Sequence, residues 1–171
     1  MLIVEGMSGS AVRVVVYENL QCGDCAALRH MLDRQILPQY GASVAFEFYD
    51  FPSVKHVWSR PVSAAALYVE AHDTLLAPGF RRFALDNIER IRQSGFEVVL
   101  KQWCGYYNLN PTQMIAGLAD KQLALNVESS HQQGVARGVK KTPTVFIGDE
   151  VLIETFTAEE LSQAIERALN H

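Results

Sequence analysis

The 171-residue sequence contains no apolar run close to the roughly 18 residues that a membrane-spanning helix requires. It also lacks clusters of lysine and arginine, and its formal net charge is −4. Nucleic-acid binding depends on such clusters, because they neutralise the phosphates. The longest basic runs are the pairs Arg81-Arg82 and Lys140-Lys141. We therefore expect a globular protein that neither inserts into a membrane nor binds nucleic acid.

The first ten residues carry neither a basic leader nor an apolar stretch of about 7 to 15 residues, which together mark an export signal. As printed, the sequence therefore predicts a cytoplasmic protein. The alternative is that a signal was removed ahead of the printed Met1, in which case the protein works in the periplasm.

Cysteine is scarce as well, with three in the whole chain, and an odd number argues against a fold built only from disulfide pairs. Two of them, Cys22 and Cys25, are the first and last residues of a Cys-Gly-Asp-Cys motif. This motif lies between an apolar run at 12–17 and a helix-patterned segment at 26–37. Free N–H groups and the dipole at the start of a helix stabilise a thiolate. The motif therefore predicts Cys22 as a nucleophile and Cys25 as the resolving thiol.

The same spacing of two cysteines also forms half of many zinc sites. A zinc site needs two further ligands, and the remaining candidates are Cys104 and five dispersed histidines. None of these forms a second closely spaced pair, which favours redox chemistry. A structural metal site and a pair of inert thiols remain as alternatives.

The first 50 residues predict a β-α-β unit. Residues 12–17 are nearly all β-branched, which is typical of a strand buried on both faces, and residues 43–49 predict a second strand. Strands joined by a helix of this length are parallel. The helix is expected to keep Arg29 and Asp33 on its wet face. Residues 1–10 predict a loose lead-in or a short edge strand.

The middle of the chain, from about residue 56 to residue 137, has a helical pattern and no convincing strand. Apolar residues recur there at three- and four-residue steps, as on the buried face of a helix. Several of its residues are expected to pack in the core: Phe80, Phe83, Cys104, Tyr106 and Tyr107.

The end of the chain predicts a β-hairpin and a closing helix. Two short apolar runs, at 144–147 and 151–153, are separated by three residues that include a glycine. Thr157 is followed three residues later by Glu160, which is the pattern of a capping box. Apolar residues at helical spacing then continue to residue 169.

A β-α-β unit with two cysteines at its helix start, followed by a hairpin and a helix, resembles the thioredoxin fold. The second motif is Thr142-Pro143-Thr144, which is similar to the loop before the hairpin in that family. The resemblance implies that the Pro143 peptide bond is cis and that the loop lies against the dithiol. It also implies that the Thr142 backbone and Pro143 bind an extended substrate peptide.

The long helical segment narrows the resemblance to DsbA-like thiol-disulfide oxidoreductases. The fold class expected from it is α/β, a thioredoxin fold with an all-helical insertion between the β-α-β unit and the closing hairpin and helix. A single domain then spans 1–171, with thioredoxin-fold parts at 11–55 and 138–171 and the insertion at 56–137.

The resemblance implies disulfide exchange with protein or peptide substrates, without a metal or an organic cofactor. It implies a redox partner, which could be glutathione, a thioredoxin-type reductant or a membrane reoxidant. The direction, as oxidase, reductase or isomerase, stays open. The alternative is a non-catalytic thioredoxin-fold protein that binds a metal or a partner.

The chain departs from the family pattern at three places. Many relatives have an acidic residue six positions before the first cysteine, where this chain has Val16, and Glu18 is not assumed to replace it. Lys141 stands where relatives often have glycine, and it adds a positive charge. Between the cysteines, Gly23 and Asp24 are expected to tune the redox chemistry.

The Asp24 carboxylate should raise the pKa of Cys22 and oppose the helix dipole. This predicts a weaker oxidant than the strongest members of the family. His56, after the second strand, is expected on the surface, with a place near the dithiol as the alternative.

Overall fold

The computed structural model describes residues 3–170 and contains one five-stranded sheet with the order β1-β3-β2-β4-β5. The pair β2 and β3 is parallel, and each of the other neighbouring pairs is antiparallel. The strands are β1 (Ile3–Gly6), β2 (Arg13–Glu18), β3 (Ala45–Asp50), β4 (Thr144–Ile147) and β5 (Glu150–Ile153).

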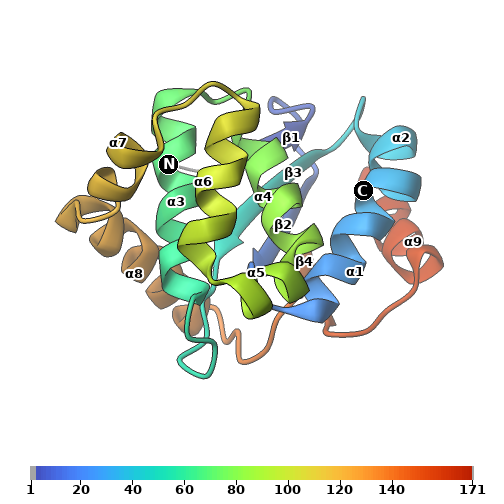
Figure 1. Cartoon of the computed structure of the whole chain (residues 1–171). Helices are drawn as coiled ribbons and strands as arrows, with labels where there is room; N and C mark the ends of the chain where they lie inside the picture. Colours follow the sequence, from blue (N-terminus) through green and yellow to red (C-terminus); the bar gives the residue numbers. More distant parts are fainter. Residues whose placement is uncertain (1–2, 171) are drawn as a thin grey trace.

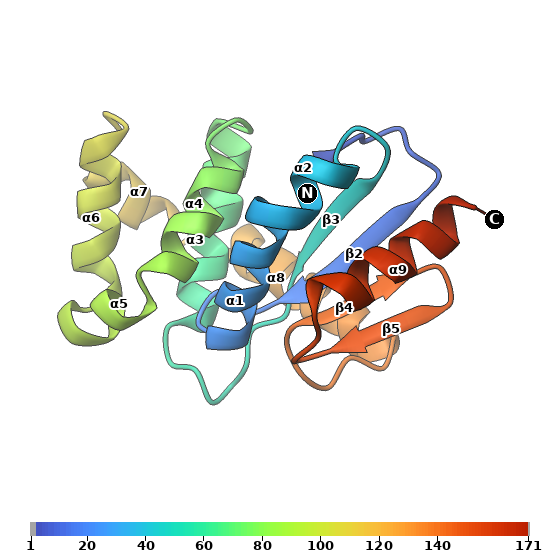
Figure 2. The same ribbon diagram turned by 90° about the vertical axis from the view of Figure 1, so that its right-hand side faces the viewer.

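Helices cover both faces of this sheet and extend beyond it (Figures 1 and 2). Figure 2 shows α1 and α9 in front of the sheet, α8 behind it, and the other helices of the insertion to one side. Their bounds are α1 (Gly23–Met31), a π-helical turn (Leu32–Ile36), α2 (Leu37–Tyr40), α3 (Ser59–His72), α4 (Ala77–Asp86), α5 (Ile88–Ser94), α6 (Phe96–Tyr106), α7 (Pro111–Gly117), α8 (Lys121–Ala136) and α9 (Ala158–Leu169). Within residues 3–170, no helix combines the length and the apolar character needed to cross a membrane.

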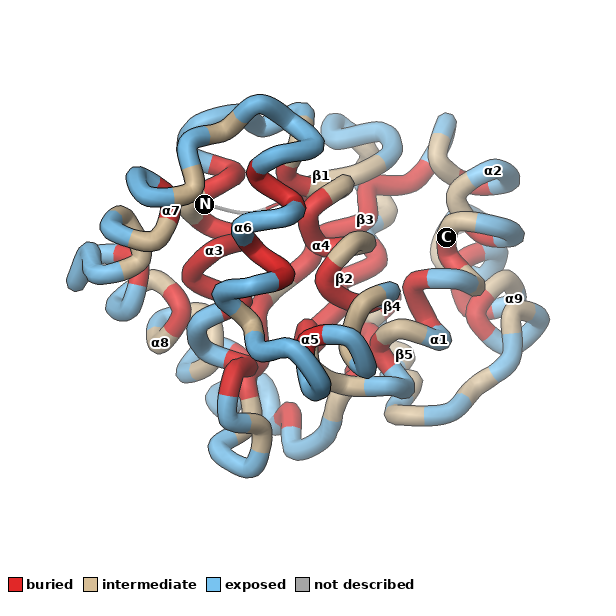
Figure 3. Tube along the Cα trace, viewed as in Figure 1, coloured by how far each residue is buried: buried red, intermediate tan, exposed pale blue. Residues whose placement is uncertain are grey.

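The strand β2 lies at the centre of the sheet and is buried on both faces, as its run of β-branched residues predicted. Val14 pairs with Phe46 and Val16 with Phe48 in parallel register, and all four side chains are buried. The expected β-α-β unit is therefore confirmed. Figure 3 shows the buried residues of these strands continuing into the adjoining helices.

The helical segment after the dithiol contains a π-helical turn that the sequence pattern did not predict. Its buried residues Leu28, Leu32, Ile36 and Tyr40 are spaced by four. In a regular α-helix, each four-residue step rotates the side chain by about 40°, so such a series leaves the buried face. The wider π-helical turn at Leu32–Ile36 offsets this rotation and keeps the series on the sheet.

The expectation that Arg29 lies on the wet face of this helix was wrong. Its side chain is buried, where Nη1 donates to Glu5 at 2.7 Å and Nε donates to Asp33 at 3.1 Å. The guanidinium also lies 5.1 Å from the centre of the Phe48 ring. Paired charge and an aromatic face allow an arginine to be buried, which helical periodicity alone does not reveal.

The insertion is all-helical between β3 and β4, as expected, and its core contains Phe80, Trp103 and Cys104. The expected burial of Tyr106 and Tyr107 was wrong, because their exposed fractions are 69% and 45%. The helix α6 ends at Tyr106, and Trp103 and Cys104 are the last buried residues of this helix.

The closing elements follow the sequence prediction. The strands β4 and β5 form an antiparallel hairpin, with Val145 opposite Leu152. Thr157 accepts a hydrogen bond from the backbone N–H of Glu160, and the Glu160 side chain accepts one from the backbone N–H of Thr157. This capping box fixes the start of α9 against the sheet.

Gly134 in α8 packs closely against two aromatic rings, those of Phe51 and Tyr17. A Cβ atom at this position would lie 2.6 Å from the ring of Phe51 and 3.0 Å from the ring of Tyr17. We expect Gly134→Ala to lower the free energy of unfolding by about 1 to 2 kcal/mol, because overpacking outweighs the gain in helix propensity. Denaturant unfolding followed by circular dichroism measures this change.

The matched control is Gly105→Ala in α6, where an added Cβ meets no atom within 4 Å. This variant should be as stable as the parent or more stable by up to about 1 kcal/mol. Equal stability of the two variants would contradict the close packing of α8 on the sheet.

Candidate active site

The dithiol lies at the junction of the central strand and the first helix. Cys22 is the N-cap residue of α1, and its N–H donates to the carbonyl of Asn19 at 2.9 Å. Cys25 is in the first turn of the helix and is fully buried, whereas Cys22 is partly accessible. Both thiols are free. The positions of the two cysteines at the helix start agree with the sequence prediction.

The pKa of Cys22 is lowered to about 6 from the usual 9.0. A hydrogen bond from the Cys25 thiol is the largest cause, and the backbone N–H groups of Asp24 and Cys25 act in the same direction against burial. The Cys22 sulfur also lies 3.4 Å from the carbonyl oxygen of Thr142. At neutral pH this thiol is mostly thiolate and can act as a nucleophile.

The pKa of Cys25 is raised well above its usual range. Burial is the main cause, followed by the hydrogen bond and charge of Cys22 and the charge of Glu18. The backbone N–H of Asn19, which lies 3.4 Å from the Cys25 sulfur, acts in the opposite direction. The two thiols therefore differ in the way that exchange chemistry requires, with one ionised and accessible and the other protonated and buried.

The loop before β4 lies against the dithiol, although 120 residues separate Thr142 from Cys22. The peptide bond between Thr142 and Pro143 is cis, as the resemblance implied. The Pro143 carbonyl accepts a hydrogen bond from Glu154 at 2.8 Å, and the Thr144 hydroxyl donates to the Lys141 carbonyl at 2.7 Å. These bonds hold the Thr142 backbone facing the cavity beside Cys22.

A buried ion triad lies beneath the site and was not expected from the sequence. The Arg81 guanidinium of α4 donates to Glu18 at 2.8 Å and to Asp50 at 3.0 and 3.1 Å. The Ser63 hydroxyl of α3 donates to Asp50 at 2.9 Å. The two carboxylates hold the pKa of Arg81 well above its usual range, against the effect of burial.

Glu18 thus supplies a buried negative charge near the resolving thiol. Val16 and Glu18 are two residues apart on β2 and therefore point to the same face of the sheet. Glu18 therefore lies one side-chain position nearer the end of β2 than Val16, on the same face of the strand. The sequence does show an acidic residue at the end of each parallel strand, Glu18 and Asp50. It does not show that Arg81, which lies far along the chain, pairs with both of them.

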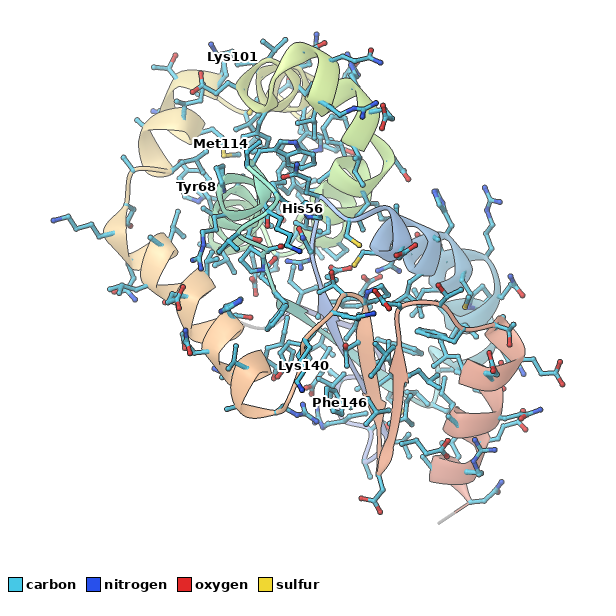
Figure 4. All side chains as sticks on the ribbon, turned by 90° about the horizontal axis from the view of Figure 1, so that it is seen from below. His56, Tyr68, Lys101, Met114, Lys140 and Phe146 are labelled. Atoms are coloured by element: carbon cyan, nitrogen blue, oxygen red, sulfur yellow. The ribbon has the colours of Figure 1, made fainter. Side chains whose placement is uncertain are left out.

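A cavity of about 760 Å³ opens at the dithiol. His56 lines this cavity and is half-buried, so the expectation of a surface position was wrong. Figure 4 looks at this end of the molecule and labels His56 and Lys140. Three segments line most of the cavity, and single residues of α8 and of the stretch after β5 complete it. The lining residues are Asn19, Gln21, Cys22, Gly23 and Asp24; Phe51, Pro52, Ser53, Val54 and His56; Val139, Lys140, Lys141 and Thr142; and His131 and Glu154.

The charges around the cavity are mixed. Lys140 and Lys141 are exposed, and the Lys141 ammonium pairs with Glu154 at 2.6 Å. The effect of the Asp24 carboxylate on Cys22 stays a prediction, since the contribution identified for Asp24 is its backbone N–H. Among residues 3–170, no three or more histidine, cysteine or acidic side chains are grouped so as to hold a metal ion.

A mixed sheet with a dithiol at its first helix and a cis-proline loop opposite defines the thioredoxin-fold class. A family model described as Thioredoxin matches residues 2–167, and the chain belongs to this family. No curated protein matches the sequence.

Several solved structures share the fold. The thiol-disulfide exchange protein alpha-DsbA2 from Wolbachia pipientis is 19% identical, with a TM-score of 0.78 over 96% of this chain and 85% of that one. Oxidised BdbD from Bacillus subtilis is 19% identical, with a TM-score of 0.77 over 99% and 93%. A periplasmic thioredoxin-like protein from Salmonella enterica serovar Typhimurium is 17% identical, with a TM-score of 0.75 over 99% and 91%. These likenesses confirm the DsbA-like fold.

The hydrogen bond between the two thiols can be tested by changing Cys25. We expect Cys25→Ala to raise the pKa of Cys22 from about 6 toward 9.0, because the largest stabilising donor is lost. Cys25→Ser keeps a donor and should leave the pKa much closer to 6. The pH dependence of alkylation by iodoacetamide, in a Cys104→Ser background, measures both values. The same midpoint in the two variants would show that the Cys25 donor does not control Cys22.

The ion triad can be tested by Arg81→Met. Removing the cation leaves Glu18 and Asp50 buried and uncompensated, so we expect the free energy of unfolding to fall by about 3 to 5 kcal/mol. The control is Arg167→Met, which removes an exposed ion pair with Glu150 and should change stability very little. Urea unfolding of both variants measures the difference. Equal losses would contradict the dependence of the two carboxylates on Arg81.

Proposed function

We propose that the protein is a thiol-disulfide oxidoreductase that exchanges disulfides with protein or peptide substrates through its Cys-Gly-Asp-Cys motif. The observation that carries this proposal is that the pKa values of two cysteines in one helical turn are shifted in opposite directions. The pKa of Cys22 is lowered to about 6 at an open cavity, and that of Cys25 is raised in the core. Two inert structural thiols are not expected to have pKa values shifted in opposite directions.

In the reductive direction, the Cys22 thiolate attacks one sulfur of a substrate disulfide. A mixed disulfide forms, and the other substrate sulfur leaves as a thiolate that takes up a proton. Cys25 then loses its proton and attacks the Cys22 sulfur, which releases the second substrate thiol and forms the Cys22–Cys25 disulfide. Oxidation of a dithiol substrate follows the same steps in reverse. The cysteine pair carries both electrons, so the exchange needs no further cofactor.

The proposed substrate is an extended polypeptide, whose backbone pairs with Thr142 beside Pro143. Three observations support it: the position of the Thr142 carbonyl beside the Cys22 sulfur, the open cavity in front of it, and the apolar character of part of its wall. Val54 in this wall has an exposed fraction of 89% and is free to contact an apolar side chain. The helical insertion at 56–137 is proposed as the part of the domain that closes this cavity on one side.

We further propose that the protein works in an oxidising compartment, with a reoxidant or a small-thiol pool as its redox partner. The description of the Salmonella enterica neighbour as periplasmic supports this alternative over a cytoplasmic site. Disulfide exchange in the oxidising direction persists only where the surroundings do not reduce the product.

Trapping of the mixed disulfide tests the proposed function. Cys25→Ser should accumulate a covalent adduct at Cys22 with a peptide that contains one disulfide, whereas Cys22→Ser should form none. The unchanged protein should lose two hydrogens on oxidation, with the mass restored by dithiothreitol. Stoichiometric bound zinc that protects both thiols, together with no adduct, would favour the non-catalytic alternative instead.

The dipeptide between the cysteines gives a separate prediction. We expect Asp24→Asn to lower the pKa of Cys22 further and to shift the equilibrium with glutathione toward the reduced protein by about two- to fivefold, because one nearby negative charge is removed. Asp149→Asn, in the exposed turn of the hairpin, is the control and should change neither value. The glutathione equilibrium, followed by intact mass, gives the result. An unchanged equilibrium would exclude a tuning role for the Asp24 side chain.

A further inference from the structure

Asn19 is a buried residue that contacts both the resolving thiol of Cys25 and His56, in the segment after β3. Its backbone N–H lies 3.4 Å from the Cys25 sulfur. Its side-chain oxygen accepts a hydrogen bond from the N–H of Gln21 at 3.0 Å, and its side-chain nitrogen lies 2.7 Å from Nδ1 of His56. The residue is almost completely buried, so these partners replace water.

The hydrogen-bond partners of Asn19 determine which role the His56 ring takes in their contact. Because the amide oxygen is used by Gln21, the amide nitrogen faces His56 and donates to Nδ1. In this arrangement Nδ1 of His56 is the acceptor, so the ring donates only through Nε2.

We propose that His56 is a positioning residue for the resolving step: as a hydrogen-bond acceptor it holds the Asn19 side chain, so that the Asn19 backbone N–H points at the Cys25 sulfur. The proposal rests on the proposed function, because it concerns the attack of Cys25 on a mixed disulfide at Cys22. It assigns a role to a residue that is distant from the motif in sequence and belongs to the cavity wall.

The Asn19 N–H matters because Cys25 ionises in an unfavourable place. Burial, Cys22 and the charge of Glu18 all raise the pKa of Cys25, and the Asn19 N–H is the contribution that lowers it. Cys25 must nevertheless become a thiolate to attack the Cys22 sulfur. In that step a bond forms between the two protein sulfurs, the bond from Cys22 to the substrate breaks, and the released substrate sulfur takes up a proton.

His56 also links the step to the cavity in which the substrate is proposed to bind. The segment 53–58 is attached to the dithiol loop twice, through His56 and through the Trp58 N–H, which donates to the Gln21 side chain at 3.0 Å. Between these attachments, Val57 has an exposed fraction of 88%. The ionisable groups that share the cavity with His56, or flank it on its own segment, are Cys22, Asp24, Lys55, His131, Lys140, Lys141 and Glu154.

The test separates the two chemical steps. The reduced protein, in a Cys104→Ser background, is mixed with glutathione disulfide, quenched with acid at set times and analysed by intact mass. Gain of one glutathione reports attack by Cys22, and its later loss with formation of the internal disulfide reports attack by Cys25. We expect His56→Ala to slow the second step about fivefold, the value of one hydrogen bond, and to leave the first within about twofold.

His56→Asn supplies the matched rescue, because the oxygen of the asparagine side chain can take the place of Nδ1 as the acceptor. It should resolve the mixed disulfide within about twofold of the unchanged protein at pH 7.5. His72→Asn, at the exposed end of α3, should behave as the unchanged protein.

A normal second step in His56→Ala overturns the proposal, as does a second step in His56→Asn that is as slow as in His56→Ala. These outcomes differ from failure of the proposed function, in which the unchanged protein itself forms no mixed disulfide and no internal disulfide.

Discussion

The unequal surroundings of two cysteines in one helical turn are the constraint on which the site depends. Cys22 receives hydrogen bonds and remains accessible, whereas Cys25 is buried and faces the charge of Glu18. The helix start supplies the donors for the first, and the packing of α1 on the sheet buries the second.

The helical insertion contributes to this arrangement from a distance. Its Arg81 compensates the carboxylates at the ends of both parallel strands, and Ser63 completes the hydrogen bonding of Asp50. The segment that leads into the insertion carries His56 to the cavity. Helices α3 and α4 therefore supply the groups that compensate the carboxylates beneath the dithiol, and the segment before α3 lines the cavity.

The fold and the dithiol could be predicted because their signals are local. The β-branched run of β2, the two cysteines and the hairpin each specify their structure within a few residues. The ion triad could not be predicted, since it depends on how α4 packs against strands 31 and 63 residues away. The same holds for His56, 37 residues from its partner Asn19. The burial of Arg29 depends likewise on partners from β1 and β3, which periodicity does not report.

The central claim is that Cys22 and Cys25 form a reversible redox pair of intermediate strength, and its most direct test is the redox potential in glutathione buffers, with Cys104 changed to serine. A Cys22 pKa of about 6 lies between those of the strongest oxidants and the reductants of the superfamily. The account therefore predicts a potential between about −250 and −150 mV. A potential at or above about −120 mV, or failure to form the disulfide in any buffer, would contradict it.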